Sequence, residues 1–347
     1  MKENSLSNQD SASVSTRRGF INAVAAAGGA ALFGRLGISP AHAVEVTGRA
    51  ERPLKAAFSN AGLQATWCAQ GKRAAEYWGK VFNVEVTWFD GELSPTKQRK
   101  AVDNMATEKW DFVAIQALTE GTLTDPANKM IAAGIPVVSI DTLIAPYDQV
   151  NVHTRLTPDN NFMGTSVTQA LVDAIGGEGN MVMTTGPLGF SAVQGRSKAF
   201  ESVVKKFPKI NVLDTAPADW DVTKTARIWE TWLNKYPKID AAFFHNDDMA
   251  LAAYNVMKAH NRTSILIGGV DAMPPAIEAV LDGRMYATVR GSSARMHCGA
   301  VIAGVAAVLG GEKTGPGGIP QTIVIDGPVV TKENAAGMLW LEDHYLM

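Results

Sequence analysis

The chain has 347 residues, of which 46% are hydrophobic and 19% charged, so it is too apolar to be disordered and long enough for about two domains. Its formal net charge is −2, and Lys, Arg, Asp and Glu are spread evenly along it. Because it has no basic patch to meet phosphate groups, nucleic acid is not an expected partner.

The first 43 residues have the order of parts of an export signal. A polar start precedes Arg17 and Arg18, an apolar stretch covers residues 23–36, and Ala41-His42-Ala43 supplies the pattern that signal peptidase cuts. The paired arginines ahead of Phe20 resemble the twin-arginine export signal. The alternative is a membrane anchor, but glycines and an arginine interrupt a run shorter than the roughly 20 apolar residues a spanning helix needs. We therefore expect residues 1–43 to be removed.

The mature chain is then expected to be soluble in the periplasm, since no later segment is predicted to be long and apolar enough to span a bilayer. From residue 54, short apolar runs alternate with longer stretches of helical period, which predicts a parallel sheet covered by helices. The first expected strands are 54–58, 84–88, 112–115 and 137–140, and the helices between them are 66–80, 95–107 and 126–133. Together they predict one doubly wound lobe.

The pattern restarts after a less regular passage at 147–157, beginning with a helix at 159–175. The second series of strands is 181–184, 210–213, 241–244, 265–267 and 286–289, with helices at 192–206, 223–236, 247–260 and 274–281. A helix at 294–309, a strand at 322–325 and a helix at 332–337 close the chain. A second lobe of the same construction follows, and the absence of a Gly/Ser tract at 151–157 favours a structured hinge.

Cys68 and Cys298 are the only cysteines in the sequence. They are too few for a disulfide framework and too far apart to form a zinc motif. Two ordinary buried thiols are the expectation, and a single long-range bridge is the alternative.

Ligands of open parallel sheets bind beyond the carboxyl ends of the strands, where loops and helix N-termini converge. Polar side chains follow nearly every expected strand: Ser59, Asn60 and Gln64 with Trp67, then Asp141, Gln194, the run His245-Asn246-Asp247-Asp248, Asp271 and Arg290. Carboxylates accept from hydroxyls, amides donate and accept, and Arg donates in a fixed fork, so the set matches a ligand with many hydroxyls.

Trp67 would offer an apolar face for the C–H side of a sugar ring. Taken singly, these residues have ordinary structural explanations. Asp247 would serve as a helix cap, Trp67 as core and Asp141 as a turn former. Their recurrence at successive strand ends favours a binding site.

At these residues the chain resembles the type I periplasmic sugar-binding proteins, the group that includes the ribose-binding protein. The resemblance covers nearly all of the mature chain. It rests on 57–60 (AFSN), 136–141 (PVVSID), 158–160 (PDN), 194–196 (QGR), 236–241 (YPKIDA), 245–250 (HNDDMA) and 268–271 (GGVD).

The resemblance implies that Asp141, Asn246 and Asp271 exchange hydrogen bonds with sugar hydroxyls. Ser59, Asn60 and Gln64 lie in the first strand-helix loop, and Trp67 lies near the family's stacking aromatics. Gln194 stands where ribose binders have Arg, and Arg290 stands near a late ligand-binding Gln. These departures allow a ligand smaller, more flexible or more anionic than a pyranose.

The resemblance also implies an α/β fold of two doubly wound parallel-sheet lobes joined by a multi-strand hinge, the type I periplasmic binding protein fold. The lobes are expected at 53–154 with 291–322, and at 155–290 with 323–347. The implied function is capture of a small carbohydrate or polyol in the interlobe cleft for uptake by an ABC transporter. The expected partners are that ligand and an inner-membrane permease, and a monomer is expected.

Three other functions are compatible with a chain of this size. An enzyme is not favoured, because the sequence holds no G-x-G-x-x-G after the first strand, no G-x-x-x-x-G-K-[ST], no H-E-x-x-H and no G-x-S-x-G. We accordingly expect no catalytic residues, cofactor or metal. A transcriptional repressor would need a helix-turn-helix where the export signal stands. A receptor that presents a sugar-like signal to a membrane sensor stays open as the alternative function.

Overall fold

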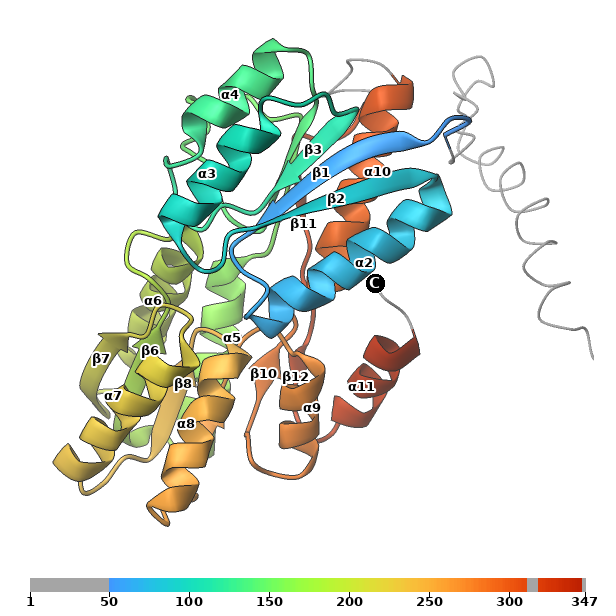
Figure 1. Cartoon of the computed structure of the whole chain (residues 1–347). Coiled ribbons are helices and arrows are strands. Elements are labelled where there is room, and N and C mark those ends of the chain that lie inside the picture. The colour runs from blue at the N-terminus through green and yellow to red at the C-terminus, as the bar shows by residue number, and fades with distance from the viewer. Residues whose placement is uncertain (1–49, 311–317, 345–347) are drawn as a thin grey trace, which may run out of the picture. The chain divides into compact units, whose positions relative to one another are not determined.

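The computed structural model describes residues 50–310 and 318–344, so the predicted export signal at 1–43 lies outside the described residues. The first lobe is built on a six-stranded sheet in the order β11-β5-β4-β3-β1-β2 (Figure 1). Every neighbouring pair in it is parallel, as predicted. Its strands are β1 (Leu54–Asn60), β2 (Val84–Asp90), β3 (Phe112–Ile115), β4 (Val137–Ile140), β5 (Thr154–Thr157) and β11 (Thr322–Val324).

Alternation along β1 sends successive side chains to opposite faces of this sheet. Phe58 packs with α2 (Thr66–Phe82) and α10 (Ser293–Gly310) on one face. Ala57 packs with α3 (Pro95–Met105) and α4 (Thr124–Ala132) on the other. Helices on both faces make the lobe doubly wound, as predicted.

Helix α10 corrects one expectation from the sequence. With 18 residues and a mean hydropathy of 1.4, it is long and apolar enough to cross a membrane by length and composition. In the fold, 61% of the helix is buried, and it packs on α2 and on strands β3 and β4. Gly304 lies so close to Phe112 that an added Cβ would fall 2.2 Å from the ring. The apolar composition of α10 is therefore explained by packing in the core of the first lobe.

The second lobe is built on the sheet β7-β6-β8-β9, which is also parallel. Its strands are β6 (Glu178–Thr185), β7 (Lys209–Pro217), β8 (Ala241–Phe244) and β9 (Leu266–Gly268), and its helices are α5 (Asn160–Ala174), α6 (Ser191–Val204), α7 (Val222–Lys235), α8 (Asp247–Ala259) and α9 (Pro274–Leu281). Phe243 packs with α5 and α6, and Phe244 packs with α7 and α8. The second lobe thus repeats the construction of the first.

Several short elements lie where the chain passes from one lobe to the other. Strand β10 (Thr288–Val289) lies within the predicted strand 286–289. It pairs antiparallel with β12 (Val329–Val330), a strand that the sequence did not predict, and α11 (Ala335–His344) packs on the second lobe. Strand β5 lies within the passage that was expected to be irregular, and β5 and β11 both belong to the first sheet. The predicted lobe boundaries at 154, 290 and 322 stay a prediction.

The predicted last helix at 332–337 is wrong in its bounds, because the helix begins at Ala335 and runs to His344. The sequence suggested an end at Gly337, but this glycine lies inside the helix and has open space where a Cβ would stand. Cys68 and Cys298 are both buried and free, so the bridged alternative is not formed in this structure.

Candidate functional site

A pocket between the two lobes lies at the carboxyl ends of their strands. Four sequence-predicted residues line it together: Trp67, Asp141, Asn246 and Asp271. The other lining residues are Ala61, Ala65, Cys68, Leu93, Gln116, Phe190, Ala192, Arg196 and Trp220. Chain segments from both lobes therefore meet around one small space of about 50 Å³.

Asp141 follows β4 and presents its carboxylate to the pocket. Its φ of 61° is in the left-handed region, and its backbone N–H donates to the carbonyl of Leu156 at 2.7 Å. Gln116 donates from Nε2 to Asp141 Oδ2 at 3.0 Å. Desolvation in the pocket raises the pKa of Asp141, and the Arg196 charge and the Gln116 hydrogen bond oppose that rise.

Gln116 is itself held in a fixed orientation. Its Oε1 accepts from the backbone N–H of Ala61 at 3.1 Å and from the thiol of Cys68 at 3.4 Å. Gln98 donates to the Gln116 backbone carbonyl at 2.8 Å. With the oxygen occupied in this way, the amide N–H group must point to Asp141, so the first lobe places a hydrogen-bonded carboxylate at the pocket.

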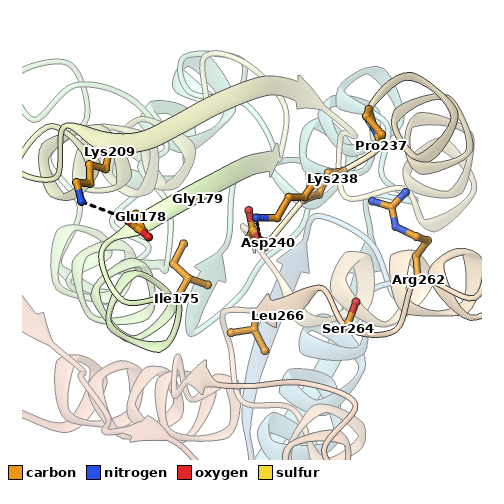
Figure 2. A pocket seen from close by; sticks show the side chains of 11 residues that line it. Ile175, Glu178, Gly179, Lys209, Pro237, Lys238, Asp240, Arg262, Ser264 and Leu266 are labelled. Carbon is orange, nitrogen blue, oxygen red and sulfur yellow. Dashed lines mark hydrogen bonds and ion pairs between the residues drawn. The ribbon is translucent and has the colours of Figure 1, made fainter.

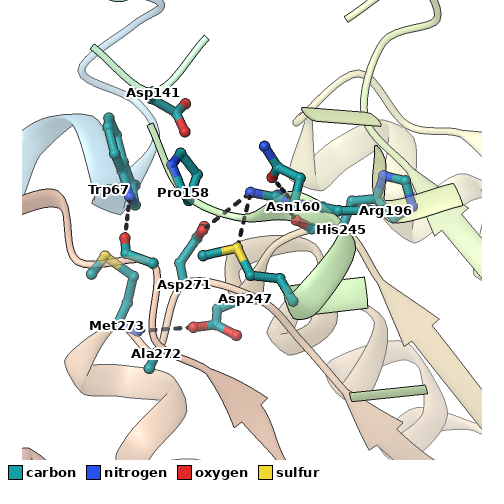
Figure 3. A network of polar contacts seen from close by, with 12 residues as sticks. Trp67, Asp141, Pro158, Asn160, Arg196, His245, Asp247, Asp271, Ala272 and Met273 are labelled. Atoms are coloured by element: carbon teal, nitrogen blue, oxygen red, sulfur yellow. Dashed lines mark hydrogen bonds and ion pairs between the residues drawn. The ribbon is translucent and has the colours of Figure 1, made fainter. Parts of the chain in front are cut away.

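Arg196 of α6 is the cation of the pocket (Figure 3). Its Nε donates to Asn160 Oδ1 at 2.9 Å, and its Nη1 donates to the backbone carbonyl of His245. Its Nη2 lies 3.9 Å from Asp271 Oδ1. Burial raises the pKa of Asp271 well above its ordinary value, and the Arg196 charge counteracts this effect. The guanidinium therefore favours the ionised forms of Asp141 and Asp271 against the effect of their burial.

Asn246 and Asp247 stand at the start of α8 and have different roles. Asn246 Oδ1 accepts from the backbone N–H of Met249 at 3.0 Å as the helix cap, which leaves its amide N–H group for the pocket it lines. Asp247 is 1% exposed and accepts from the Thr288 hydroxyl at 2.7 Å and from the Met273 backbone N–H at 2.8 Å. Through its bond to Met273, Asp247 thus holds the segment that follows Asp271 against the start of α8 (Figure 3).

Aromatic side chains from both lobes form the apolar wall. Trp67 donates from Nε1 to the carbonyl of Gly291 at 2.7 Å, which fixes its ring at the pocket. Trp220 has φ 61°, and its ring lies 5.8 Å from that of Phe190 in an edge-to-face arrangement. Gly186 gives it room, since an added Cβ there would fall 2.2 Å from the Trp220 ring.

The remaining predicted site residues lie outside the pocket lining. Ser59 and Asn60 are buried within the first lobe, where Ser59 Oγ accepts from Gln98 at 3.4 Å and Asn60 donates to the Cys68 carbonyl at 3.3 Å. Gln64 and Gln194 are exposed. Neither residue lines the interlobe pocket.

Arg290 was expected at the ligand and lies elsewhere. It is 6% exposed, and its Nε and Nη2 donate to Glu342 Oε1 at 2.9 and 2.6 Å. The Glu342 carboxylate of α11 thus pairs with the guanidinium group that the sequence analysis expected to bind the ligand.

Arg196, Gln116 and Trp220 were missed as site residues. For Arg196 the sequence held a usable signal, because Ala192, Val193, Arg196, Ala199 and Phe200 form the buried face of α6 at helical spacing. Position 194 falls on the opposite face. Gln116 follows β3 directly, so the strand-end argument applied to it as well.

A second hollow, of about 830 Å³, lies at the amino ends of the strands of the second sheet (Figure 2). Its lysines are already paired, since Lys209 bonds Glu178 at 3.0 Å and Lys238 lies 3.2 Å from Asp240. None of the predicted site residues lines it. The interlobe pocket is therefore the candidate site. Within the described ranges, no group of three His, Cys, Asp or Glu side chains is placed to hold a metal ion.

Comparisons with known proteins agree with this geometry. A family model described as the periplasmic binding protein domain matches residues 56–313. A xylitol-binding protein of Mycolicibacterium smegmatis is 27% identical over 274 residues, which are 78% of this chain and 75% of that protein. A ribose import binding protein of Bacillus subtilis is 28% identical over 218 residues, 63% of this chain and 70% of that protein.

Among solved structures, an ABC transporter solute binding protein from Bacillus halodurans with bound myo-inositol has a TM-score of 0.76 at 22% identity. The match covers 84% of this chain and 99% of that chain, and it confirms the predicted two-lobed fold class. With the family model and the two relatives, it establishes that the chain belongs to the type I periplasmic binding proteins, the family of the ribose-binding protein.

Proposed function

We propose that this chain is an exported solute-binding protein that captures a small sugar or sugar alcohol in the interlobe pocket. It would act as a monomer in the periplasm, pass the ligand unchanged to the permease of an ABC importer, and perform no chemistry on it. The observation that carries the proposal is that Asp141, Asn246 and Asp271, from three distant segments, line one pocket together with Trp67. Relatives named for binding xylitol and ribose support the ligand class.

Each wall of the pocket suits one part of such a ligand. The Asp141 and Asp271 carboxylates accept from hydroxyl groups, and the Asn246 amide and Arg196 donate to hydroxyl oxygens. Trp67 contributes an apolar face for the C–H side of the carbon chain or ring. A polyol offers both kinds of surface, whereas an aliphatic molecule would leave the buried polar groups unsatisfied.

Entry of the ligand requires movement of the lobes. Arg196, Asn246, Asp271 and Trp67 are only 4%, 6%, 7% and 7% exposed. Groups this deeply buried are reached from solvent only when the lobes separate. A ligand that contacts both lobes binds the closed arrangement more tightly than the open one, and this difference in affinity stabilises the closed arrangement.

A thermal-shift screen of the mature protein against aldoses, ketoses, sugar alcohols, sugar acids and amino acids tests the proposal. A ligand at about 100 times its Kd stabilises the native state by about 2.7 kcal/mol, which raises the melting temperature by several degrees. We expect at least one sugar or sugar alcohol to do so. Shifts with amino acids only, and none with any carbohydrate, would contradict the ligand class.

Site variants then test the pocket with a matched control. Removing one charge-assisted hydrogen bond costs about 1.5–3 kcal/mol, so Asp141→Asn and Asp271→Asn should each weaken binding about tenfold or more in calorimetry. Gln194→Ala is the control, because this exposed residue was predicted from the sequence but lies outside the pocket lining. Equal losses in all three variants would contradict the assignment of the site.

A further inference from the structure

The N-terminal end of helix α2 lacks a cap within its own lobe. Ala65 stands at the cap position and supplies no side-chain acceptor. Asp248 of α8, in the second lobe, accepts from the Thr66 backbone N–H at 2.9 Å and from the Thr66 hydroxyl at 2.7 Å. A carboxylate at the free N–H groups of a helix start satisfies these donors and interacts favourably with the helix dipole. The second lobe therefore caps a helix of the first lobe.

One turn further along α2, Gln70 makes a second contact of the same kind. Its Nε2 donates to Glu342 Oε2 at 2.7 Å, and Glu342 belongs to α11, which packs on the second lobe. Gln70 and Glu342 are 8% and 7% exposed. The other Glu342 oxygen accepts from Arg290, so the carboxylate is fixed before it meets α2. Two carboxylates of the second lobe thus bind the first two turns of α2.

We propose that these first two turns of α2 form a closure latch, with Asp248 and Glu342 as positioning residues that set the balance between open and closed lobes. A rotation that separates the lobes breaks both contacts and leaves the start of α2 uncapped. Neither carboxylate lines the ligand pocket. The latch therefore favours closure without contacting the ligand. This inference rests on the proposed function, because closure of the lobes is the step that traps the ligand.

The apparent affinity of a protein that binds in one conformation scales with the population of that conformation. Removal of a helix cap costs a free energy that corresponds to about a 2- to 30-fold change in an equilibrium constant, here that between open and closed lobes. Loss of the latch should therefore weaken ligand binding by a similar factor, chiefly through faster release. The loss should be equal for all ligands that close the lobes, because the latch makes no contact with them.

The test uses Thr66→Val and Gln70→Met, which change no charge. Thr66→Val removes the hydroxyl donor and keeps the backbone N–H bond to Asp248, and Gln70→Met removes the amide while leaving the Glu342 pair with Arg290 intact. The double variant therefore removes two of the three hydrogen bonds of the latch. Gln70 Oε1 has no hydrogen-bond partner among the described residues, so its loss should not harm the first lobe. Asp221→Ala is the control, since Asp221 caps α7 within one lobe.

Closure is measured without ligand by the distance between spin labels at Lys129→Cys in the first lobe and Lys258→Cys in the second, both exposed positions. We expect the Thr66→Val, Gln70→Met double variant to populate longer distances, with the closed fraction reduced about tenfold. The Asp221→Ala control should keep the parent distribution. An unchanged distribution in the double variant overturns the latch, whether or not a sugar is found to bind. A chain that binds no sugar but still shows the shift contradicts the proposed function alone.

Discussion

Replacement of Asp247 by Asn should reduce the pH dependence of the free energy of unfolding. Asp247 is 1% exposed, and desolvation raises its pKa from 3.8 to about 8. Between these values the folded chain holds a proton that the unfolded chain has released. The unfolded state then binds fewer protons than the native state, so the free energy of unfolding falls as the pH rises. The stabilising contribution is complete below about pH 4 and is lost by about pH 8.

The size of the effect follows from the separation of the two pKa values. Each pKa unit corresponds to about 1.4 kcal/mol, so the loss across the window is on the order of a few kcal/mol. Asn mimics the protonated acid. Its oxygen can accept from the Met273 N–H and its amide can donate to the Thr288 hydroxyl oxygen, which are the two groups that Asp247 contacts now.

Urea unfolding at pH 5, 6, 7 and 8 measures the difference. The parent chain should lose stability steadily over this range, and Asp247→Asn should give a flatter profile that crosses above it near pH 8. Asp221→Asn, at an exposed helix cap, serves as the control and should run parallel to the parent. Parallel profiles for Asp247→Asn and the parent would refute the reasoning, because they would mean that Asp247 is ionised in the folded chain.

Three further predictions concern the pocket and the core beside it. Arg196→Gln removes the cation 3.9 Å from Asp271 and a hydrogen-bond donor that lines the pocket, so calorimetry at pH 7 should show ligand affinity at least about tenfold lower. Trp220→Ala removes part of the apolar wall and should weaken binding about tenfold in the same assay. Gly71→Ala places a Cβ 2.2 Å from the buried His297 ring, so urea unfolding should show a loss of about 1–3 kcal/mol.

The sequence predicted the parallel sheets because each buried strand is a short apolar run between helical stretches. It predicted Asp141, Asn246 and Asp271 because a parallel sheet brings the residues after its strands to one edge. Strand β5 was not predicted because three of the four residues in its sequence, TRLT, are polar. Arg155 is nevertheless buried there, donating to the Val150 carbonyl at 3.0 Å and lying 4.3 Å from the Tyr147 ring. Tertiary contacts of this kind override local composition.

Arg290 and Arg196 show that tertiary contacts also limited the prediction of the site. Arg290 follows a strand and Arg196 lies inside a helix, so the strand-end argument favoured Arg290. What separates them is a carboxylate distant in sequence: Glu342 pairs with Arg290, whereas Arg196 faces Asp271 in the pocket. Which acid meets which base depends on where α11 packs, and no spacing within the sequence specifies that.

Several residues that line the pocket have backbone angles that are uncommon for residues other than glycine. Asp141, Asp271, Trp220 and Leu93 all line the pocket, and their φ angles are 61°, 112°, 61° and 51°. Such conformations are uncommon for residues other than glycine and cost on the order of 1–3 kcal/mol each, so they persist only where the surroundings enforce them. The N–H groups of both aspartates are held by carbonyls of neighbouring strands, at 2.7 and 2.8 Å. Because the sheets impose these conformations before a ligand arrives, the carboxylates and the apolar wall need little further ordering on binding, and the binding free energy is correspondingly more favourable.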